Sequence, residues 1–132
     1  MRKGLILDDE RTIRQVFEQA KSYNADLVGL VDWWDVTTDI YEFQHFIQNN
    51  DLPDFISFDH DLGANDLNYD DRTENGLQCV KWLVDYLETT KQRMPLWFVH
   101  SANVVGKNNI EAYVDSALRS GYILGNSMKV VY

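Results

Sequence analysis

The chain of 132 residues is poor in cysteine and in positive charge, and it contains no long apolar run. Because Cys79 is the single cysteine, no disulfide can form within the chain, which is typical of a reducing compartment. Twelve Lys and Arg residues against 21 Asp and Glu residues give a formal net charge of −9. An extended nucleic-acid-binding surface needs clustered basic residues, so the composition argues against one. It does not exclude a short nucleotide or an RNA end that is held through a metal ion.

The sequence also lacks the segments that direct a chain to or through a membrane. No stretch is long and apolar enough for a membrane span, and only four residues separate Met1–Lys3 from Asp8. We therefore expect neither a secretory leader nor a membrane partner, and we predict a cytoplasmic protein. With 45% apolar and 25% charged residues, the composition is that of a single globular domain over residues 1–132.

Short β-like runs alternate with longer helix-like runs along the chain, which predicts βα units around a parallel sheet. Strands are expected at residues 4–7, 27–31, 55–58, 96–99 and 128–132. Helices are expected at residues 11–23, at about 40–47 with Asp35 or Thr37 as the cap, at 76–91 and at 109–120. Right-handed crossovers then give a three-layer α/β/α sandwich. The polar segment 63–74 is expected to be a lid, a binding loop or a plain surface connection.

Acidic residues follow two of the expected strands at the point where each strand ends. Asp8 and Asp9 come after residues 4–7, and Asp59 and Asp61 come after residues 55–58. Because the carboxyl edge of an open parallel sheet is where ligands bind, we expect these side chains to meet there. Like charges at one edge are costly unless a cation neutralises them, and oxygen ligands favour Mg²⁺ or Mn²⁺. For Asp8 or Asp9, a plain helix-capping role is the alternative.

Polar groups at the third strand end extend this set. His100 follows the strand at 96–99 and is a candidate general acid or base, with a satisfied core histidine as the alternative. Ser101 and Asn103 come next and could donate hydrogen bonds to phosphoryl oxygens. In an extended segment His60 points away from its acidic neighbours, so a structural role stands beside a catalytic one.

Two cations stand at expected helix starts, where an anion could bind. Lys107 lies in the segment 106–109, which is expected to open the last helix with free backbone N–H groups. Arg11 lies in the first turn of the first expected helix, where a cation opposes the helix dipole unless it faces an anion. A plain surface arginine is the alternative.

The pair Trp33–Trp34 is interpreted as a rim or interface patch, with nucleobase stacking as the alternative.

The strings Leu7–Arg11, Ile56–Gly63 and His100–Asn103 resemble the cyclic-phosphate-processing receiver-like family. Its members are bacterial and phage proteins related in fold to response-regulator receivers. The resemblance covers nearly the whole chain, and its most specific part is the Ser-Phe-Asp-His-Asp-Leu string. It implies a flavodoxin-like, receiver-like parallel sheet and a metal-dependent activity on cyclic phosphates, at RNA ends or in nucleotide signals.

Comparison with ordinary receivers shows both agreement and departure. The acidic pair after the first strand matches their metal ligands, Asp59 matches the phospho-accepting Asp, and Ser101–Ala102 matches the switch position. Receivers carry a Lys at the end of the fifth strand, whereas residues 121–124 contain none. The two histidines beside these motifs add acid–base groups that a phosphorelay does not need. The resemblance therefore disfavours signalling through a phosphorylated Asp.

The leading prediction is a metal-dependent phosphoesterase whose substrate is a cyclic phosphate in a nucleotide or at an RNA end, with Mg²⁺ or Mn²⁺ as cofactor. The predicted metal ligands are Asp8, Asp9, Asp59 and Asp61. The predicted catalytic residues are His100, Asp59 and His60. The predicted substrate contacts are Arg11, Ser101, Asn103 and Lys107. The alternatives are a non-catalytic module that binds a nucleotide, a protein partner or a second copy of the chain, and, less favoured, a phospho-accepting receiver.

Overall fold

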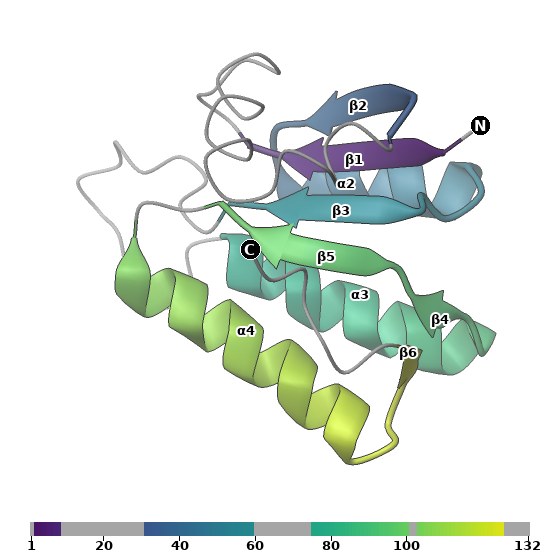
Figure 1. The fold of residues 1–132 in the computed structure, drawn as a ribbon. Coiled ribbons are helices and arrows are strands. Elements are labelled where there is room, and N and C mark those ends of the chain that lie inside the picture. The colour runs from purple at the N-terminus through teal and green to yellow at the C-terminus, as the bar shows by residue number, and fades with distance from the viewer. Residues whose placement is uncertain (1, 9–30, 60–74, 101–102, 126–132) are drawn as a thin grey trace.

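The structure, a computed structural model, describes residues 2–8, 31–59, 75–100 and 103–125. Along the chain its elements are β1 (Lys3–Leu7), β2 (Trp33–Thr37), α2 (Ile40–Asn49), β3 (Phe55–Phe58), α3 (Gly76–Thr90), β4 (Arg93–Met94), β5 (Leu96–Val99), α4 (Val104–Arg119) and β6 (Leu124–Gly125). Strands β2, β1, β3 and β5 form one parallel sheet in that order (Figure 1). Strands β4 and β6 pair in parallel as a second, smaller sheet. The predicted parallel α/β architecture is confirmed.

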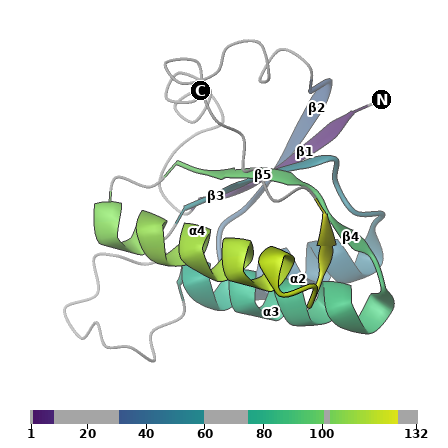
Figure 2. The same cartoon turned by 60° about the horizontal axis from the view of Figure 1, so that its bottom comes forward.

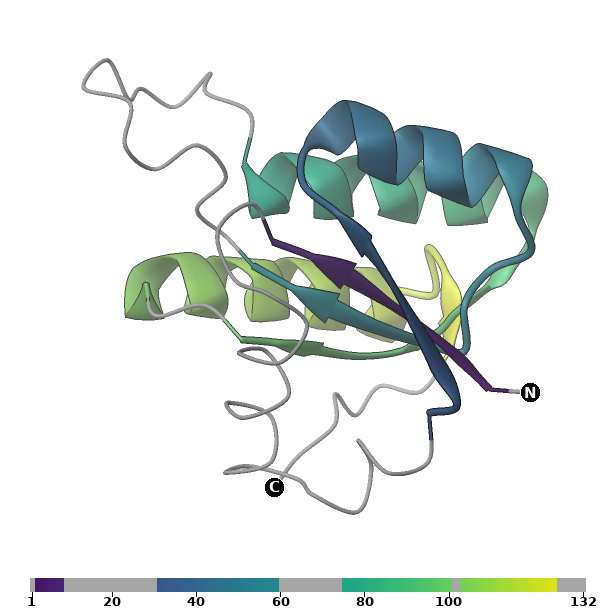
Figure 3. The same cartoon turned by 90° about the horizontal axis from the view of Figure 1, so that it is seen from above.

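Helices α2, α3 and α4 lie on one face of the four-stranded sheet (Figure 2 and Figure 3). Toward them the sheet presents side chains that are in register across neighbouring strands, among them Leu5, Ile56 and Trp97. Burying this apolar layer against the helices supplies the main stabilisation of the domain. The helix expected to cover the other face, at residues 11–23, lies outside the described residues, as do the segment 63–74 and the strand expected at 128–132.

Polar caps fix where the helices begin and end. The Asp39 side chain accepts a hydrogen bond from the Glu42 backbone N–H (2.8 Å), and the Glu42 carboxylate accepts one from the Thr38 N–H (2.8 Å). The first bond satisfies a donor that the first helical turn leaves without a partner, and the second ties the residue before the cap to that turn. Asn75 caps α3, which ends at Lys91 in the left-handed conformation (φ 58°).

Within the described residues, no helix has the length and apolarity needed to cross a membrane.

The second strand lies later in the chain than predicted, and residues 27–30 of the expected strand 27–31 lie outside the described residues. β2 occupies Trp33–Thr37, so Val31 precedes the strand, and Asp35 and Thr37 are strand residues and not helix caps. Each β2 residue pairs with one residue of β1, from Lys3 with Trp33 to Leu7 with Thr37. Thr37 is buried, and its hydroxyl donates to a β1 carbonyl (3.1 Å). Pairing with β1 and this burial therefore outweigh the apolar run at 27–31 on which the sequence prediction depended.

The last helix also begins earlier than predicted, at Val104 and not at residue 109. The Asn103 side chain accepts a hydrogen bond from the Gly106 N–H (3.0 Å), and the Lys107 N–H donates to the Asn103 carbonyl (2.8 Å). Asn103 is therefore the N-cap. The segment 106–109, which the sequence predicts as the start of the helix, lies inside α4.

The predicted tryptophan patch is divided by the sheet. Trp33 is 58% exposed, as expected of a rim residue, whereas Trp34 is half-buried and packs edge-on against Phe55 (ring centroids 5.4 Å apart). Trp34 also covers Gly4 on the neighbouring strand. Only Trp33 therefore fits the interpretation as an exposed aromatic.

Candidate functional site

Three predicted site residues stand at equivalent positions along the carboxyl edge of the sheet. Asp8, Asp59 and His100 are each the first residue after a strand, and each donates its backbone N–H to the last residue of a neighbouring strand. The accepting carbonyls are those of Thr37, Leu7 and Phe58, at 3.0, 2.9 and 2.9 Å. The ladder of the parallel sheet therefore continues one residue beyond the strands and fixes all three backbones in register.

The side chains of this edge group, Asp8, Asp59 and His100, meet in the protein interior. Each offers a ligand atom, and these atoms lie within 4.8 Å of one another. The residues are only 1%, 4% and 1% exposed, respectively. His100 Nε2 lies 2.9 Å from the nearer Asp8 carboxylate oxygen. The expectation that carboxylates from β1 and β3 meet at this edge is confirmed for Asp8 and Asp59.

The other ring nitrogen of His100 is also engaged. Its Nδ1 shares a hydrogen bond with the hydroxyl of Ser57, a fully buried residue of β3. Phe98 lies against the imidazole with ring centroids 6.1 Å apart. His100 is thus held from three sides, and its Nε2 is directed toward the carboxylates.

The electrostatics of the edge group favour a positively charged occupant. With both carboxylates ionised, the group carries a net negative charge even when the imidazole is protonated. Burial makes that charge costly, because water cannot screen it. Two oxygen donors and one nitrogen donor are chemically suited to a divalent cation such as Mn²⁺, and Mg²⁺ accepts the oxygen donors. The residues present therefore fit the predicted metal ion.

The other predicted site residues divide into two groups. Five lie outside the part of the chain that the structure describes: Asp9, Arg11, His60, Asp61 and Ser101. Asn103 and Lys107 are described, and the helix start expected at 106–109 lies at Val104, so their predicted contacts with substrate stay predictions. Asn103 uses its side-chain oxygen as the cap of α4, and Lys107 lies within the first turn of that helix.

Sequence reasoning assigned no role to Ser57, although a signal was available. Ser57 is the one polar residue of the strand Phe55–Phe58 and stands two residues before Asp59. Residues two apart in a strand share a face of the sheet, so this spacing alone places the Ser57 hydroxyl on the same side as the edge group.

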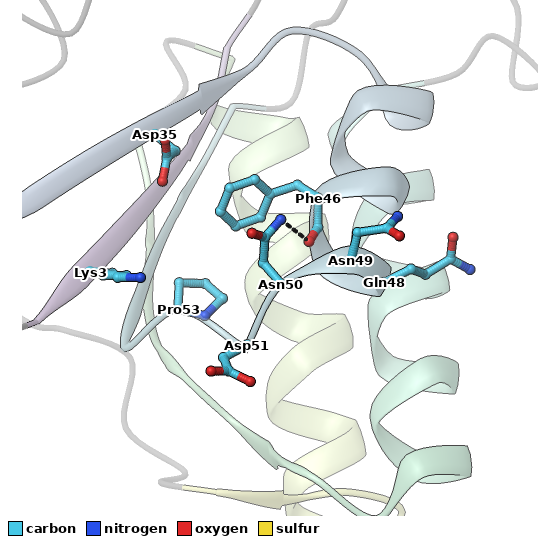
Figure 4. Close-up of a pocket in the computed structure, with 8 residues that line it drawn as sticks. All are labelled: Lys3, Asp35, Phe46, Gln48, Asn49, Asn50, Asp51 and Pro53. Carbon is cyan, nitrogen blue, oxygen red and sulfur yellow. Dashed lines mark hydrogen bonds between the residues drawn. The ribbon is translucent and has the colours of Figure 1, made fainter.

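A cavity of about 530 Å³ lies at the opposite, amino edge of the sheet, beside the end of α2 (Figure 4). It is lined by Lys3, Asp35, Phe46, Gln48, Asn49, Asn50, Asp51 and Pro53. The Asn50 amide donates to the Phe46 carbonyl (3.0 Å) and so closes the end of α2. No predicted site residue lines this cavity, and its exposed carboxylate Asp51 makes a useful control for the buried Asp59.

A parallel sheet in the order β2-β1-β3-β5, with acidic residues at the carboxyl ends of β1 and β3, defines a receiver-like α/β domain. A family model described as the cyclic-phosphate processing receiver domain matches residues 3–116. The chain belongs to this family, as the resemblance of its motifs implied, and it is a receiver-like domain involved in cyclic-phosphate processing. The comparisons with curated proteins and with solved structures found no match.

Proposed function

We propose that this domain is a metal-dependent phosphoesterase that hydrolyses a cyclic phosphate in a nucleotide or at an RNA end. The observation that carries the proposal is the buried edge group in a chain that belongs to a cyclic-phosphate-processing family. Asp8 and Asp59 would hold Mg²⁺ or Mn²⁺ through their carboxylate oxygens, with His100 Nε2 as a further donor. Asp9 and Asp61 stay predicted ligands.

The residues of the edge group have separate tasks in this proposal. A bound divalent ion offsets phosphoryl charge and lowers the pKa of a water molecule attached to it. Asp8 and Asp59 keep the site anionic and fixed by the sheet, so that little reorganisation is needed when substrate arrives. His100 has a single nitrogen directed at the carboxylates, so that atom either binds the ion or moves a proton, and cannot do both at once.

A nucleotide or RNA end is supported as the substrate class by an apolar pair at the same edge. Val104 and Val105, in the first turn of α4, are 67% and 70% exposed. The start of α4 lies on the side of the sheet at which β1, β3 and β5 end (Figure 1). Exposed apolar side chains beside a polar site offer a contact surface for a base or ribose. Val105→Ser is expected to raise the KM for a 2′,3′-cyclic nucleotide more than the KM for cyclic glycerol phosphate.

A non-catalytic binding module is the second candidate, and one observation favours it. Both ring nitrogens of His100 already have protein partners, Ser57 and Asp8. Proton transfer to a substrate would require the imidazole to give up the bond to Asp8. A module that only captures the phosphate would leave this arrangement intact.

The test is hydrolysis of 2′,3′-cyclic AMP, and of an RNA oligonucleotide ending in a 2′,3′-cyclic phosphate, in Mn²⁺, in Mg²⁺ and in EDTA. We expect product only with metal and a loss of at least about 100-fold in Asp59→Asn and in His100→Ala, since even outer-shell metal partners give 10–100-fold effects. Asp51→Asn removes the same charge at the other edge of the sheet and should retain full activity. Full activity in Asp59→Asn would refute the proposal. Tight binding by calorimetry with no product by chromatography would select the binding module.

A further inference from the structure

Ser57 is the most buried polar side chain near the edge group, and the proposed chemistry gives it no task. It is fully buried in the middle of β3, between apolar neighbours. A hydroxyl in such surroundings is costly unless it is hydrogen-bonded, and its partner here is His100 Nδ1.

The contact follows from the register of the sheet. Ser57 pairs with Phe98 of β5, and His100 stands two residues further on the same face. The Ser57 hydroxyl therefore reaches diagonally along the face to one side of the imidazole, while Asp8 bonds the other side at 2.9 Å. Both His100 and Asp8 side chains are fully buried, so water does not compete for either nitrogen.

A neutral imidazole carries one ring hydrogen, on either Nδ1 or Nε2. When Nε2–H donates to Asp8, Nδ1 must accept, and the Ser57 O–H can donate to it. When the Nε2 lone pair faces a cation, the hydrogen sits on Nδ1 and must donate, and the Ser57 oxygen can accept it. A hydroxyl serves both forms, whereas a carbonyl oxygen could serve only the second.

We propose that Ser57 is a positioning residue: it holds His100 with Nε2 facing the carboxylates and supports the tautomer that binds a divalent cation. This inference rests on the proposed cation site and deepens it, since such outer hydrogen bonds orient metal-binding histidines and raise their basicity. Ser57 does not act as a nucleophile despite the Asp8–His100–Ser57 chain of contacts. Its hydroxyl has no exposure through which a substrate could reach it.

The test measures cation binding and imidazole protonation without any substrate. Calorimetry with Mn²⁺ compares wild type, Ser57→Ala, Ser57→Thr and Ser57→Val. Thr and Val have nearly the same shape and differ in the hydroxyl, so they form a matched pair even if the cavity left in Ser57→Ala impairs folding. We expect Ser57→Thr to bind within about threefold of wild type, and Ser57→Ala and Ser57→Val to bind 10–100-fold more weakly.

Nitrogen-15 spectra of histidine-labelled protein supply the second readout, with diamagnetic Zn²⁺ as the probe and His100→Gln to assign the signals. In wild type and Ser57→Thr, Zn²⁺ should leave the hydrogen on Nδ1 and shift the Nε2 signal. In Ser57→Val, the two nitrogens should show a mixture of forms. Equal Mn²⁺ affinity and equal spectra in Ser57→Thr and Ser57→Val would overturn the inference, as would wild type that binds neither cation. Cation binding by wild type without hydrolysis of cyclic phosphates would instead overturn the proposed function alone.

Discussion

Replacing Asp59 with Asn should make the metal-free domain more stable while removing its response to metal. Asp8 and Asp59 place carboxylate oxygens within 4.8 Å of each other in a buried site. At that distance, and with an effective dielectric constant of about 20, two unit negative charges repel by about 3 kcal/mol. Asn keeps the size of Asp and removes the charge. We expect the free energy of unfolding in EDTA to rise by about 1–3 kcal/mol, after partial compensation by the His100 imidazole.

Thermal denaturation in EDTA and in Mn²⁺ measures both effects. For a chain of this length, 1 kcal/mol corresponds to about 3–5 °C in Tm. Mn²⁺ at 100 times its Kd should stabilise wild type by about 2.7 kcal/mol and Asp59→Asn by far less. The control is Asp51→Asn, which removes an exposed carboxylate near the end of α2 and should change stability by less than about 0.5 kcal/mol.

A lower Tm of Asp59→Asn in EDTA, followed by an equal rise in the Tm of both proteins in Mn²⁺, would contradict this expectation. That outcome would mean that Asp59 contributes hydrogen bonds to the fold and does not bear on a cation. A rise in EDTA together with a full response to Mn²⁺ would place the cation elsewhere in the chain.

Three further predictions concern the scaffold. In Gly4→Ala the new Cβ would lie 2.4 Å from the Trp34 ring, so the ring must move, and denaturation should show a loss of about 1–3 kcal/mol. Hydrogen bonds from the Thr38 side chain and backbone hold the pKa of Glu42 below its ordinary 4.5. The Glu42 carboxylate should therefore stabilise the folded state by under about 1 kcal/mol above pH 4.5, because the group is exposed. This contribution should vanish as the pH falls through the folded-state pKa, and denaturation of wild type and Glu42→Gln at several pH values would measure it. The Tyr122 hydroxyl donates to the Asp85 carboxylate (2.9 Å), and this hydrogen bond raises the pKa of Tyr122 above 10.0. Asp85→Asn should therefore lower the titration midpoint of Tyr122. An ultraviolet titration measures the midpoint, with Tyr122→Phe to identify the Tyr122 signal.

Much of the fold was predictable because its signals are local. The apolar strands at 55–58 and 96–99 and the helix from Gly76 agree with the structure almost residue for residue. The strands are apolar runs, as burial on both faces of a parallel sheet requires. The helix has an apolar stripe at helical spacing, as burial of one helix face requires.

The two errors in element position have different causes, one in tertiary pairing and one in a missed helix cap. Residues 33–37 contain Asp35 and Thr37, which are interpreted as helix caps from the sequence, yet pairing with β1 makes the segment a strand. The sequence predicts that the segment 106–109 opens the last helix, yet Gly106 is buried within α4, and its N–H donates to the Asn103 cap. Pairing with a strand distant in the sequence decided the conformation of residues 33–37. The Asn103 cap, three residues before Gly106, decided where α4 begins.

The site residues, like the fold, were predictable where local pattern decides and not where strand register decides. Strand-edge logic and spacing led to Asp8, Asp59 and His100, because parallel strands bring their carboxyl ends to one edge whatever the intervening chain does. The same logic gave no partner for His100, since its contact with Ser57 depends on the diagonal register between β3 and β5.

The α/β class, the membership in the receiver-like family and the two strand ends that carry acid follow from the amino-acid sequence alone, since each depends on short-range pattern and residue type. The three-dimensional arrangement was needed to find that Asp8 and Asp59 share the interior with His100, which ring nitrogen faces them and where β2 lies. Those features depend on strand register, and register is set by the simultaneous packing of segments that are far apart along the chain.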